Sequence, residues 1–271
     1  MMRMYGLTAA ALAVCLAGGL AGCKSGDAVK QTQESGNGNN AEKPSAPRTS
    51  VPLDPATLGI VSGTVHFSGK APAPVKIDMS MDPVCSITGG DNFAEQYMVH
   101  DGKLANVYVY IKSGPPAAMS ATAPVAPPVI MDQIGCKYVP HVVALMRGGS
   151  VEFRNSDGTM HNIHTLPSAA GSQSIDISQG AKGAPQVKQF NQTEVMIPVR
   201  CNNHPWMNAF VNVSATPFFA VTDTDGHFGI SGLPAGTYTL VAVHEKLGEQ
   251  TMTVTVEPKE TAKADFSFSV K

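Results

Sequence analysis

Residues 199–207 read Val199-Arg200-Cys201-Asn202-Asn203-His204-Pro205-Trp206-Met207. A cysteine, a histidine and a methionine follow one another at intervals of three, so a short loop can turn a thiolate, an imidazole and a thioether toward one point. Residues typical of a strand, Phe210-Val211-Asn212-Val213, follow directly. A tight loop of this kind between two strands predicts a β-sandwich with a metal site at one end.

A second block, upstream of the first, completes the ligand set. Residues 151–163 read Val-Glu-Phe-Arg-Asn-Ser-Asp-Gly-Thr-Met-His-Asn-Ile. A copper ion that cycles between two oxidation states needs imidazole for the oxidised form and soft sulfur for the reduced form, and two histidines, a cysteine and a weak axial methionine serve both. The sequence therefore predicts one copper ion bound by His161, Cys201, His204 and Met207.

The two blocks resemble the plastocyanin and azurin family of cupredoxins, and the Cys-x2-His-Pro-aromatic-Met loop is most similar to that of amicyanin. Tyr138-Val139-Pro140, Gly148-Gly149 and Val151-Glu152-Phe153 are also similar to the opening strands of that family. The resemblance covers residues 128–214. It implies a Greek-key β-sandwich and a type 1 (blue) copper centre for electron transfer.

The same resemblance implies roles for residues around the metal. Asn162 would tie the two ligand loops together. His204 would lie between the metal and the surface as the exit for electrons, with Pro205 and Trp206 as a docking patch for a redox partner such as a cytochrome or an oxidoreductase.

Each of these residues also has an ordinary structural explanation. Cys201 could be a buried thiol, and Met207 could simply pack in the core. His164 competes with His161 as the upstream ligand, although the His-Asn order favours His161. Trp206 could be an interface anchor or part of the core. The other histidines are expected to be structural or exposed: His66, His100, His141, His227 and His244.

The rest of the body has strand character as well. Runs of β-branched and aromatic residues are bounded by glycine and proline, and helical periodicity is weak. The 26 glycines and 20 prolines favour many turns and short strands. The fold class is therefore expected to be all-β. Strands are expected at 59–67, 105–111, 142–145, 151–154, 210–213, 238–243, 252–256 and 266–270, with surface loops at 115–128 and 166–187.

The C-terminal part carries a second resemblance. Residues 218–228, Phe-Phe-Ala-Val-Thr-Asp-Thr-Asp-Gly-His-Phe, and residues 232–240, Gly-Leu-Pro-Ala-Gly-Thr-Tyr-Thr-Leu, resemble the carboxypeptidase regulatory-like (transthyretin-like) β-sandwich module. Asp225-Gly226 is expected to form a hairpin turn, and Pro234-Ala235-Gly236 a corner between strands. The module is non-catalytic in that family, and the chain shows no peptidase motif, so we do not expect an enzyme.

The N-terminus predicts export and lipid attachment. Arg3 precedes an apolar run, and Leu20-Ala21-Gly22-Cys23 matches the lipobox of bacterial lipoproteins, in which the cysteine takes the lipid. The alternative is an ordinary secretory signal with a chance cysteine. Lys24 after the cysteine slightly favours the outer membrane. The expected location is therefore a bacterial membrane, on its periplasmic face or at the cell surface.

Two cysteines remain once Cys15, Cys23 and Cys201 have been assigned. An exported protein meets an oxidising compartment, so Cys85 and Cys136 are predicted to form a disulfide. The alternative is a second metal site that uses both thiolates.

Together these features predict that the protein is a membrane-tethered copper protein that carries one electron at a time. The net charge of −2 gives no reason to expect a nucleic-acid partner. The alternatives are copper sequestration or delivery without a redox partner, and a surface interaction protein in which copper is incidental.

The strands at 59–67 and 105–111 are expected to pair with residues 217–256, with the cupredoxin inserted between them. The expected divisions are a signal peptide at 1–22, a lipidated cysteine and flexible linker at 23–55, an N-terminal β segment at 56–127, a cupredoxin domain at 128–214 and a regulatory-like module at 215–271.

Overall fold

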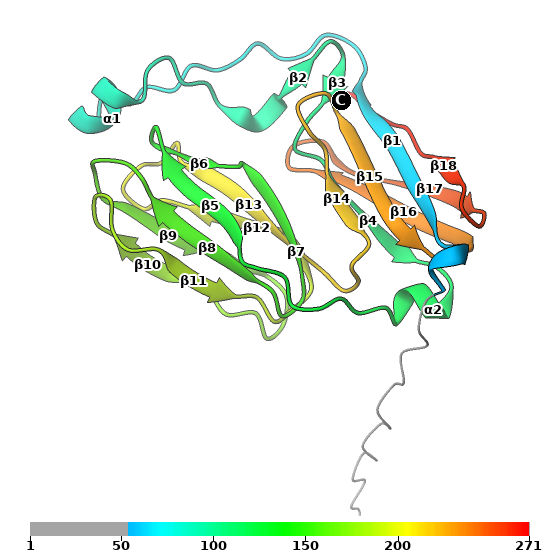
Figure 1. Ribbon diagram of the computed structural model, residues 1–271. Helices are drawn as coiled ribbons and strands as arrows, with labels where there is room; N and C mark the ends of the chain where they lie inside the picture. The colour runs from blue at the N-terminus through cyan, green and yellow to red at the C-terminus, as the bar shows by residue number, and fades with distance from the viewer. Residues whose placement is uncertain (1–53, 271) are drawn as a thin grey trace, which may run out of the picture. The chain divides into compact units, whose positions relative to one another are not determined.

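The computed structural model describes residues 54–270. The predicted signal peptide, the predicted lipid-attachment residue Cys23 and most of the predicted linker lie outside these residues. A single 3-10 turn, η1 (Pro55–Thr57), precedes the first strand. The strands then form two β-sandwiches, each built from two sheets (Figure 1). None of the helices in residues 54–270 has the length and apolar character needed to cross a bilayer.

Sandwich A contains strands β5 to β13. Its first sheet has the order β10-β9-β12-β13-β7, and its second the order β11-β8-β5-β6. Strands distant in sequence pair here, including the parallel pairs β7/β13 and β5/β8. The strands are β5 (Val129–Ile134), β6 (Lys137–Val139), β7 (Val142–Met146), β8 (Ser150–Asn155), β9 (His161–Thr165), β10 (Asp176–Gln179), β11 (Gln186–Gln189), β12 (Glu194–Arg200) and β13 (Asn208–Ser214).

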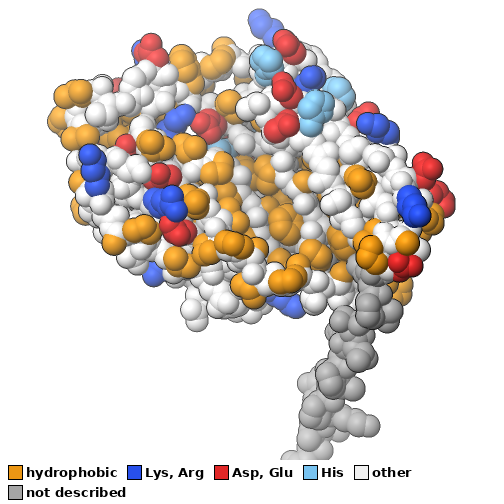
Figure 2. All heavy atoms as spheres, viewed as in Figure 1, with side chains coloured by type: hydrophobic (Ala, Val, Ile, Leu, Met, Phe, Trp, Pro, Cys, Tyr) orange, Lys and Arg blue, Asp and Glu red, His pale blue; other side chains and the backbone are white. Residues whose placement is uncertain are grey.

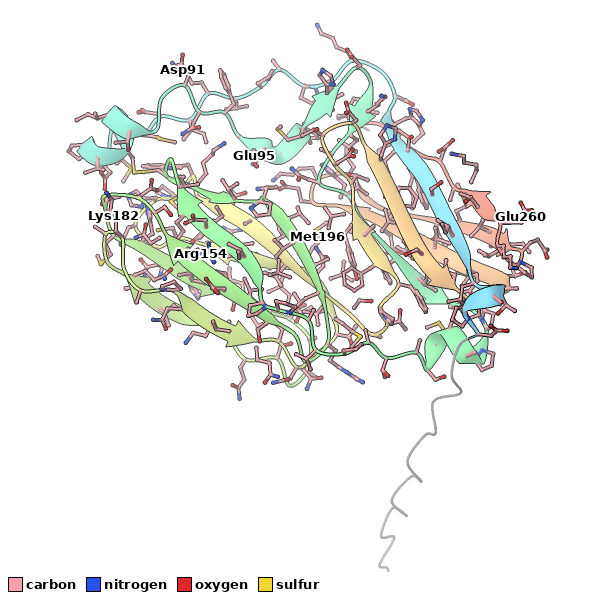
Figure 3. The ribbon with its side chains drawn as sticks, in the orientation of Figure 1. Asp91, Glu95, Arg154, Lys182, Met196 and Glu260 are labelled. Atoms are coloured by element: carbon pink, nitrogen blue, oxygen red, sulfur yellow. A yellow bond between two sulfur atoms is a disulfide. The ribbon has the colours of Figure 1, made fainter. Side chains whose placement is uncertain are left out.

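Alternation of apolar and polar residues explains how sandwich A closes. In β8, Val151 and Phe153 are buried, and the residues on either side of each are half-buried. This is the two-residue period of a strand with one face in the core. β12 carries a bulge at Met196 (labelled in Figure 3), whose φ is 53°. The register shift keeps Ile197 and Val199 in the same apolar core as Phe153 and Val211.

Sandwich B is assembled from both ends of the described chain. One sheet has β1 at its centre, paired with β15, β3, β18 and β19, and β2 pairs with β3; the other sheet has the order β14-β4-β16-β17. The strands are β1 (Gly59–Phe67), β2 (Val99–His100), β3 (Lys103–Leu104), β4 (Tyr108–Ser113), β14 (Phe219–Val221), β15 (His227–Leu233), β16 (Gly236–His244), β17 (Gly248–Val256), β18 (Thr261–Lys263) and β19 (Phe266–Phe268).

The strand pairing predicted across the chain is confirmed. β1 pairs with β15 from Gly59 to Thr64, and β4 pairs with both β14 and β16. The two ends share one apolar core, in which Val61 and Val109 pack with Leu240 and Phe266. Gly63 permits this packing, because a Cβ there would lie 1.9 Å from the carbonyl oxygen of Ala264.

The turn at Asp225-Gly226 differs from the expected hairpin. It is tight, with the Gly226 N–H donating to the Asp223 carbonyl at 3.0 Å and φ of Gly226 at 68°. The strands it joins, β14 and β15, lie in different sheets, so they are not paired as a hairpin. Residues 234–236 likewise lead from β15 in one sheet to β16 in the other, which confirms the predicted corner.

Two segments expected to be loops contain regular structure. A short helix, α2 (Pro116–Met119), forms within residues 115–128. β10 forms within residues 166–187, and β11 begins there at Gln186. These strands are polar and lie at sheet edges, so the apolar pattern of the sequence did not reveal them.

The segment between β1 and β2, residues 68–98, leaves sandwich B and covers one end of sandwich A; we call it the cap segment. It contains α1 (Pro83–Thr88) and a 3-10 turn, η2 (Glu95–Tyr97). The disulfide between Cys85 and Cys136 fixes it to the β5–β6 turn, with a Cα–Cα distance of 5.6 Å. Glu95 (labelled in Figure 3) binds Lys137 at 2.7 Å. The predicted disulfide is confirmed, which leaves no thiol pair for the alternative second metal site.

The histidines without a predicted function divide into two groups. His66, His100 and His227 are exposed, and histidine side chains gather beside acidic ones at the upper right of Figure 2. His141, in the connection between β6 and β7, and His244, in β16, are buried instead. His141 binds Glu245 at 2.6 Å, which joins sandwich A to sandwich B through a buried pair.

Candidate metal centre

The loop between β12 and β13 is closed by its own backbone. The Met207 N–H donates to the His204 carbonyl at 2.9 Å, and the Cys201 N–H donates to the Met207 carbonyl at 3.3 Å. Because both ends of the loop are anchored in paired strands, its side chains have little freedom to move. The loop thus presents Cys201 and His204 on the side that faces β9.

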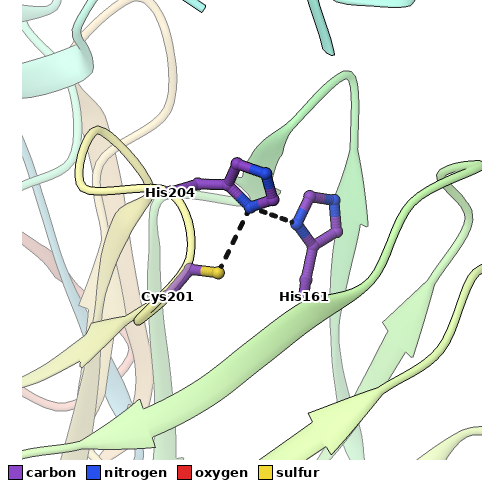
Figure 4. Close-up of side chains that lie close together, drawn as sticks. All are labelled: His161, Cys201 and His204. Atoms are coloured by element: carbon purple, nitrogen blue, oxygen red, sulfur yellow. Dashed lines mark hydrogen bonds between the residues drawn. The ribbon is translucent and has the colours of Figure 1, made fainter. Parts of the chain in front are cut away.

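His161 completes a three-residue cluster from the neighbouring strand. It is the first residue of β9, which pairs with β12. Its Nδ1 lies 2.9 Å from Nδ1 of His204, and the Cys201 sulfur lies 3.4 Å from the same His204 atom (Figure 4). Ligand atoms of all three residues lie within 4.8 Å of one another. One ion could therefore contact all three with little rearrangement.

The cluster is closed to solvent. His161, Cys201 and His204 are 0%, 4% and 3% exposed. Two imidazoles and a thiolate suit copper or zinc among the common transition metals. Charged groups that are buried in proteins are paired with one another or coordinate metal ions, so the burial of these three residues agrees with a metal site.

A carboxylate holds the outer nitrogen of each histidine. Nε2 of His161 lies 2.9 Å from Asp157 Oδ2, and Nε2 of His204 lies 3.1 Å from Asp82 Oδ2. A carboxylate accepts but does not donate, so each Nε2 carries the proton and each Nδ1 is left facing the cluster. The hydrogen bonds therefore select the tautomer that can bind a metal through Nδ1.

The two carboxylates are themselves held by backbone N–H groups. Gly135 and Cys136, with φ of 63° and 56°, form the two-residue turn between β5 and β6, and their N–H groups donate to the two oxygens of Asp157 at 2.8 Å each. Asp82 is the N-cap of α1 and accepts from Val84 and Cys85 at 2.7 and 3.1 Å.

These contacts keep both carboxylates ionised. Burial opposes ionisation of Asp82, but the His204 ring, the N–H groups of α1 and the Thr159 hydroxyl outweigh it and lower its pKa to about 2. The pKa of Asp157 is lowered in the same way, against the effect of burial, by His161 and by the N–H groups of the β5–β6 turn.

The cysteine is prepared as a thiolate. Burial raises the pKa of the Cys201 thiol. The His161 ring, the Asn162 N–H and the His204 ring lower it by more than burial raises it, so that the pKa falls to about 6. Burial disfavours the charged His161 ring, yet Asp157 and Cys201 raise its pKa to about 9. The metal-free cluster is thus a thiolate beside a protonated imidazole, and a metal ion would take the place of that proton.

Four of the sequence predictions can be compared with this geometry. His161, Cys201 and His204 meet, while His164 binds Asn202 at 2.9 Å and lies outside the cluster. Met207 is buried, in the same apolar core as Cys201. Its role as axial ligand stays a prediction.

Two expectations about the surroundings can be compared with the structure. His204 is almost completely buried, because the cap segment covers it and Asp82 binds its outer nitrogen, and its role as the exit for electrons stays a prediction. Asn162 connects the two ligand loops as predicted, through its backbone N–H, which donates to the Cys201 sulfur at 3.3 Å. Its side chain has another partner, since Nδ2 donates to Ser178 on β10 at 2.9 Å.

The proposed docking residues differ in exposure. Pro205 is exposed, whereas Trp206 is half-buried. The Trp206 indole N–H donates to the Cys136 carbonyl at 3.1 Å, and its ring centroid lies 5.1 Å from that of His204. Trp206 therefore supports the ligand loop, and the docking role stays a prediction.

Sequence reasoning missed Asp82 and Asp157. Asp157 lies four residues before His161, a spacing that is not a recognised metal-site pattern. The Asp82-Pro83 pair is a helix-start signal, which explains the cap role but not the contact with His204. The predicted disulfide was the only hint, because it brings residues near 85 to the turn at 136.

Comparison with known proteins bears on both sandwiches. The family model described as carboxypeptidase regulatory-like domain matches residues 199–269. Its first part, 199–214, lies in β12 and β13 of sandwich A, while β1 and β4 of sandwich B lie outside it. No curated protein is similar enough to the chain to count as a match.

Several solved structures are similar to part of the chain. A mutant of amicyanin in its Cu(I) form is 21% identical over 39% of this chain and 98% of its own, with a TM-score of 0.29. A purple cupredoxin from Nitrosopumilus maritimus is 20% identical over 32% of this chain and 99% of its own, with a TM-score of 0.27. A Cu-containing nitrite reductase (NirK) from Thermus scotoductus SA-01 is 23% identical over 37% of this chain, with a TM-score of 0.30, and the chain spans 25% of that protein.

The fold of the described residues is all-β and consists of two sandwiches. Sandwich A carries the cluster of His161, Cys201 and His204 at one end. Sandwich B contains most of the residues that are similar to the carboxypeptidase regulatory-like family model.

Proposed function

We propose that sandwich A binds one type 1 copper ion and that the chain carries single electrons between partner proteins. The observation that supports this most directly is the convergence of the Cys201 sulfur and the Nδ1 atoms of His161 and His204 in a buried site. When bound, copper supplies one-electron redox chemistry, and a set of two imidazoles and one thiolate suits both of its oxidation states.

The donor set fits copper better than zinc. Structural zinc sites usually have four strong ligands from cysteine, histidine or carboxylate. Here the carboxylates of Asp82 and Asp157 bind the outer nitrogens of the histidines and not the inner side of the cluster. Three strong ligands remain, and the buried thioether of Met207 is the candidate for the weak fourth position that copper accepts.

The closed site suits an electron carrier more than an enzyme. The three ligands are almost completely buried, so a substrate would not reach the metal directly. The paired strands, the loop hydrogen bonds and the two carboxylates hold the ligands in place, and a site that moves little on reduction exchanges electrons quickly. The electron would leave through the part of the protein that covers the ligands, which includes the cap segment over His204.

The proposal includes a membrane tether and a transient partner. Lipid attached to Cys23 would hold the chain at a bacterial membrane while residues 24–55, which are polar and rich in Gly, Asn and Ser, let the sandwiches reach partners. A cytochrome or oxidoreductase would dock near the exposed Pro205 and exchange an electron across a small interface.

Aerobic purification with added copper, followed by an optical spectrum and a redox titration, tests the proposal. We expect one copper ion per chain and an intense thiolate-to-copper absorption that disappears on mild reduction. A coloured protein that exchanges no electrons with any small cytochrome would favour copper sequestration or delivery. A folded protein that binds no copper would favour the surface interaction role.

A further inference from the structure

The two carboxylates behind the histidines belong to one connected unit. Asp82 accepts from the N–H of Cys85, and Asp157 accepts from the N–H of Cys136. These two cysteines are joined by the disulfide. The cap segment therefore supplies the carboxylate of Asp82 to His204, and the β5–β6 turn holds the carboxylate of Asp157 against His161. The disulfide connects the cap segment to that turn.

Asp82 and Asp157 differ in how they reach the site. Asp157 lies on the same sandwich as its partner His161, four residues away. Asp82 comes from the cap segment and is 122 residues from His204 in sequence. Its position depends on α1, on a hydrogen bond of 2.9 Å from the Thr159 hydroxyl, and on the disulfide.

We propose that Asp82, held by the Cys85–Cys136 disulfide, is a positioning residue that fixes His204 for metal binding through Nδ1 and stabilises the oxidised ion. The inference rests on the proposed copper site. A carboxylate that accepts from Nε2–H makes the imidazole a stronger electron donor at Nδ1. A nearby negative charge favours the more highly charged state of the metal, so both effects lower the reduction potential.

The Asp82→Asn substitution separates this role from the structural one. Asparagine is as good an N-cap as aspartate, so α1 keeps its first turn. With the amide oxygen kept at the position of Oδ1 by the N–H groups of α1, the amide NH2 takes the position of Oδ2. An NH2 group cannot accept from Nε2–H, so the substitution removes both this hydrogen bond and the negative charge. If the substitution weakens Cu(II) binding about tenfold relative to Cu(I), the reduction potential rises by about 59 mV, since a tenfold change is 59 mV for one electron.

Asp91→Asn is the matched control. Asp91 lies on the same cap segment, is exposed and binds only Lys76, at 2.5 Å. The Asp91→Asn substitution removes one negative charge from the cap segment, as Asp82→Asn does, but at a residue that contacts no histidine. We expect the potential to rise in Asp82→Asn and to stay at the wild-type value in Asp91→Asn, with both proteins melting near the wild type.

A second measurement needs no variant. In the reduced, diamagnetic copper form of the full chain, NMR should show the Nε2–H proton of His204 as a resolved signal protected from exchange with water. A His204 ring with its proton on Nδ1, or an Nε2–H that exchanges freely, would overturn the inference. So would equal potentials in Asp82→Asn and Asp91→Asn. A wild-type protein that binds no copper overturns the proposed function together with this inference. A coloured wild-type protein whose reduction potential equals that of Asp82→Asn overturns only the role of Asp82.

Discussion

The backbone N–H of Asn162 donates to the sulfur of Cys201 at 3.3 Å, although the two residues are 39 positions apart in the chain. This contact joins the first strand residue after His161 to the first residue of the ligand loop. It also stabilises negative charge on the sulfur, which is one reason that the pKa of Cys201 falls to about 6. The cysteine that we propose as the strongest copper ligand is therefore held in position, and its thiolate form is favoured.

Replacement of Cys201 by serine should abolish the blue site. The intense absorption requires a thiolate, which a serine hydroxyl cannot replace, although the two histidines should still bind some copper. The visible spectrum and the copper content of the loaded protein check this. Asn203→Ser, on the exposed part of the same loop, is the control and should stay blue. A blue Cys201→Ser protein would contradict the assignment of the ligand.

Met207→Leu should preserve copper binding and colour but raise the reduction potential. Leucine has nearly the volume of methionine, so the fold should lose less than about 1.5 kcal/mol of stability. The thioether, a weak donor that stabilises the oxidised ion, is lost. A redox titration measures the change, and an unaltered potential would show that Met207 only packs in the core.

Removal of the disulfide by joint Cys85→Ala and Cys136→Ala substitution should destabilise the protein. The bond closes a loop across a sequence separation of 51 residues, and its loss is expected to cost about 2–4 kcal/mol. Urea unfolding of the copper-free protein measures this, with Cys201→Ser as the control that keeps the bond. The same pair of substitutions should also raise the potential of the copper form, as Asp82→Asn does, because it frees the cap segment.

Stability should fall as the pH is lowered from about 6.5 toward 4, in part because of His244. Burial lowers the pKa of His244 to about 4; the negative charge of Glu245 opposes this shift, and His141 and Lys246 add to it. Between the two pKa values the unfolded chain binds a proton that the folded chain does not, so acid favours unfolding, by on the order of 3 kcal/mol in total.

His244→Phe tests that contribution directly. His244 packs against Tyr97 and Phe268, and its Nε2 is buried without a hydrogen-bond partner. Phenylalanine should fill the same space without taking up a proton. Denaturant unfolding at several pH values should give a flatter curve for the variant between pH 6.5 and 4. Parallel curves for variant and wild type would place the acid sensitivity elsewhere.

Local sequence determined many of the strands of this protein and the loop that carries three of the predicted metal ligands. The spacing of Cys201, His204 and Met207 lies within one loop, so short-range chain geometry is enough to predict a common direction for these side chains. The strands β1, β8 and β16 follow from apolar alternation, and the disulfide follows from the cysteine count together with the predicted export. Such features depend on neighbours along the chain or on simple elimination.

Tertiary structure alone decided what surrounds the metal site. Asp82 reaches His204 only because the chain leaves sandwich B after β1, crosses to the end of sandwich A and is bonded there through Cys85. Nothing in the residues near Asp82 encodes that distance, since it depends on how β1 pairs with β15, β18 and β19 at the other end of the chain. The burial of His204 follows from the same long-range path, which is why the sequence near His204 gave no sign of the segment that covers it.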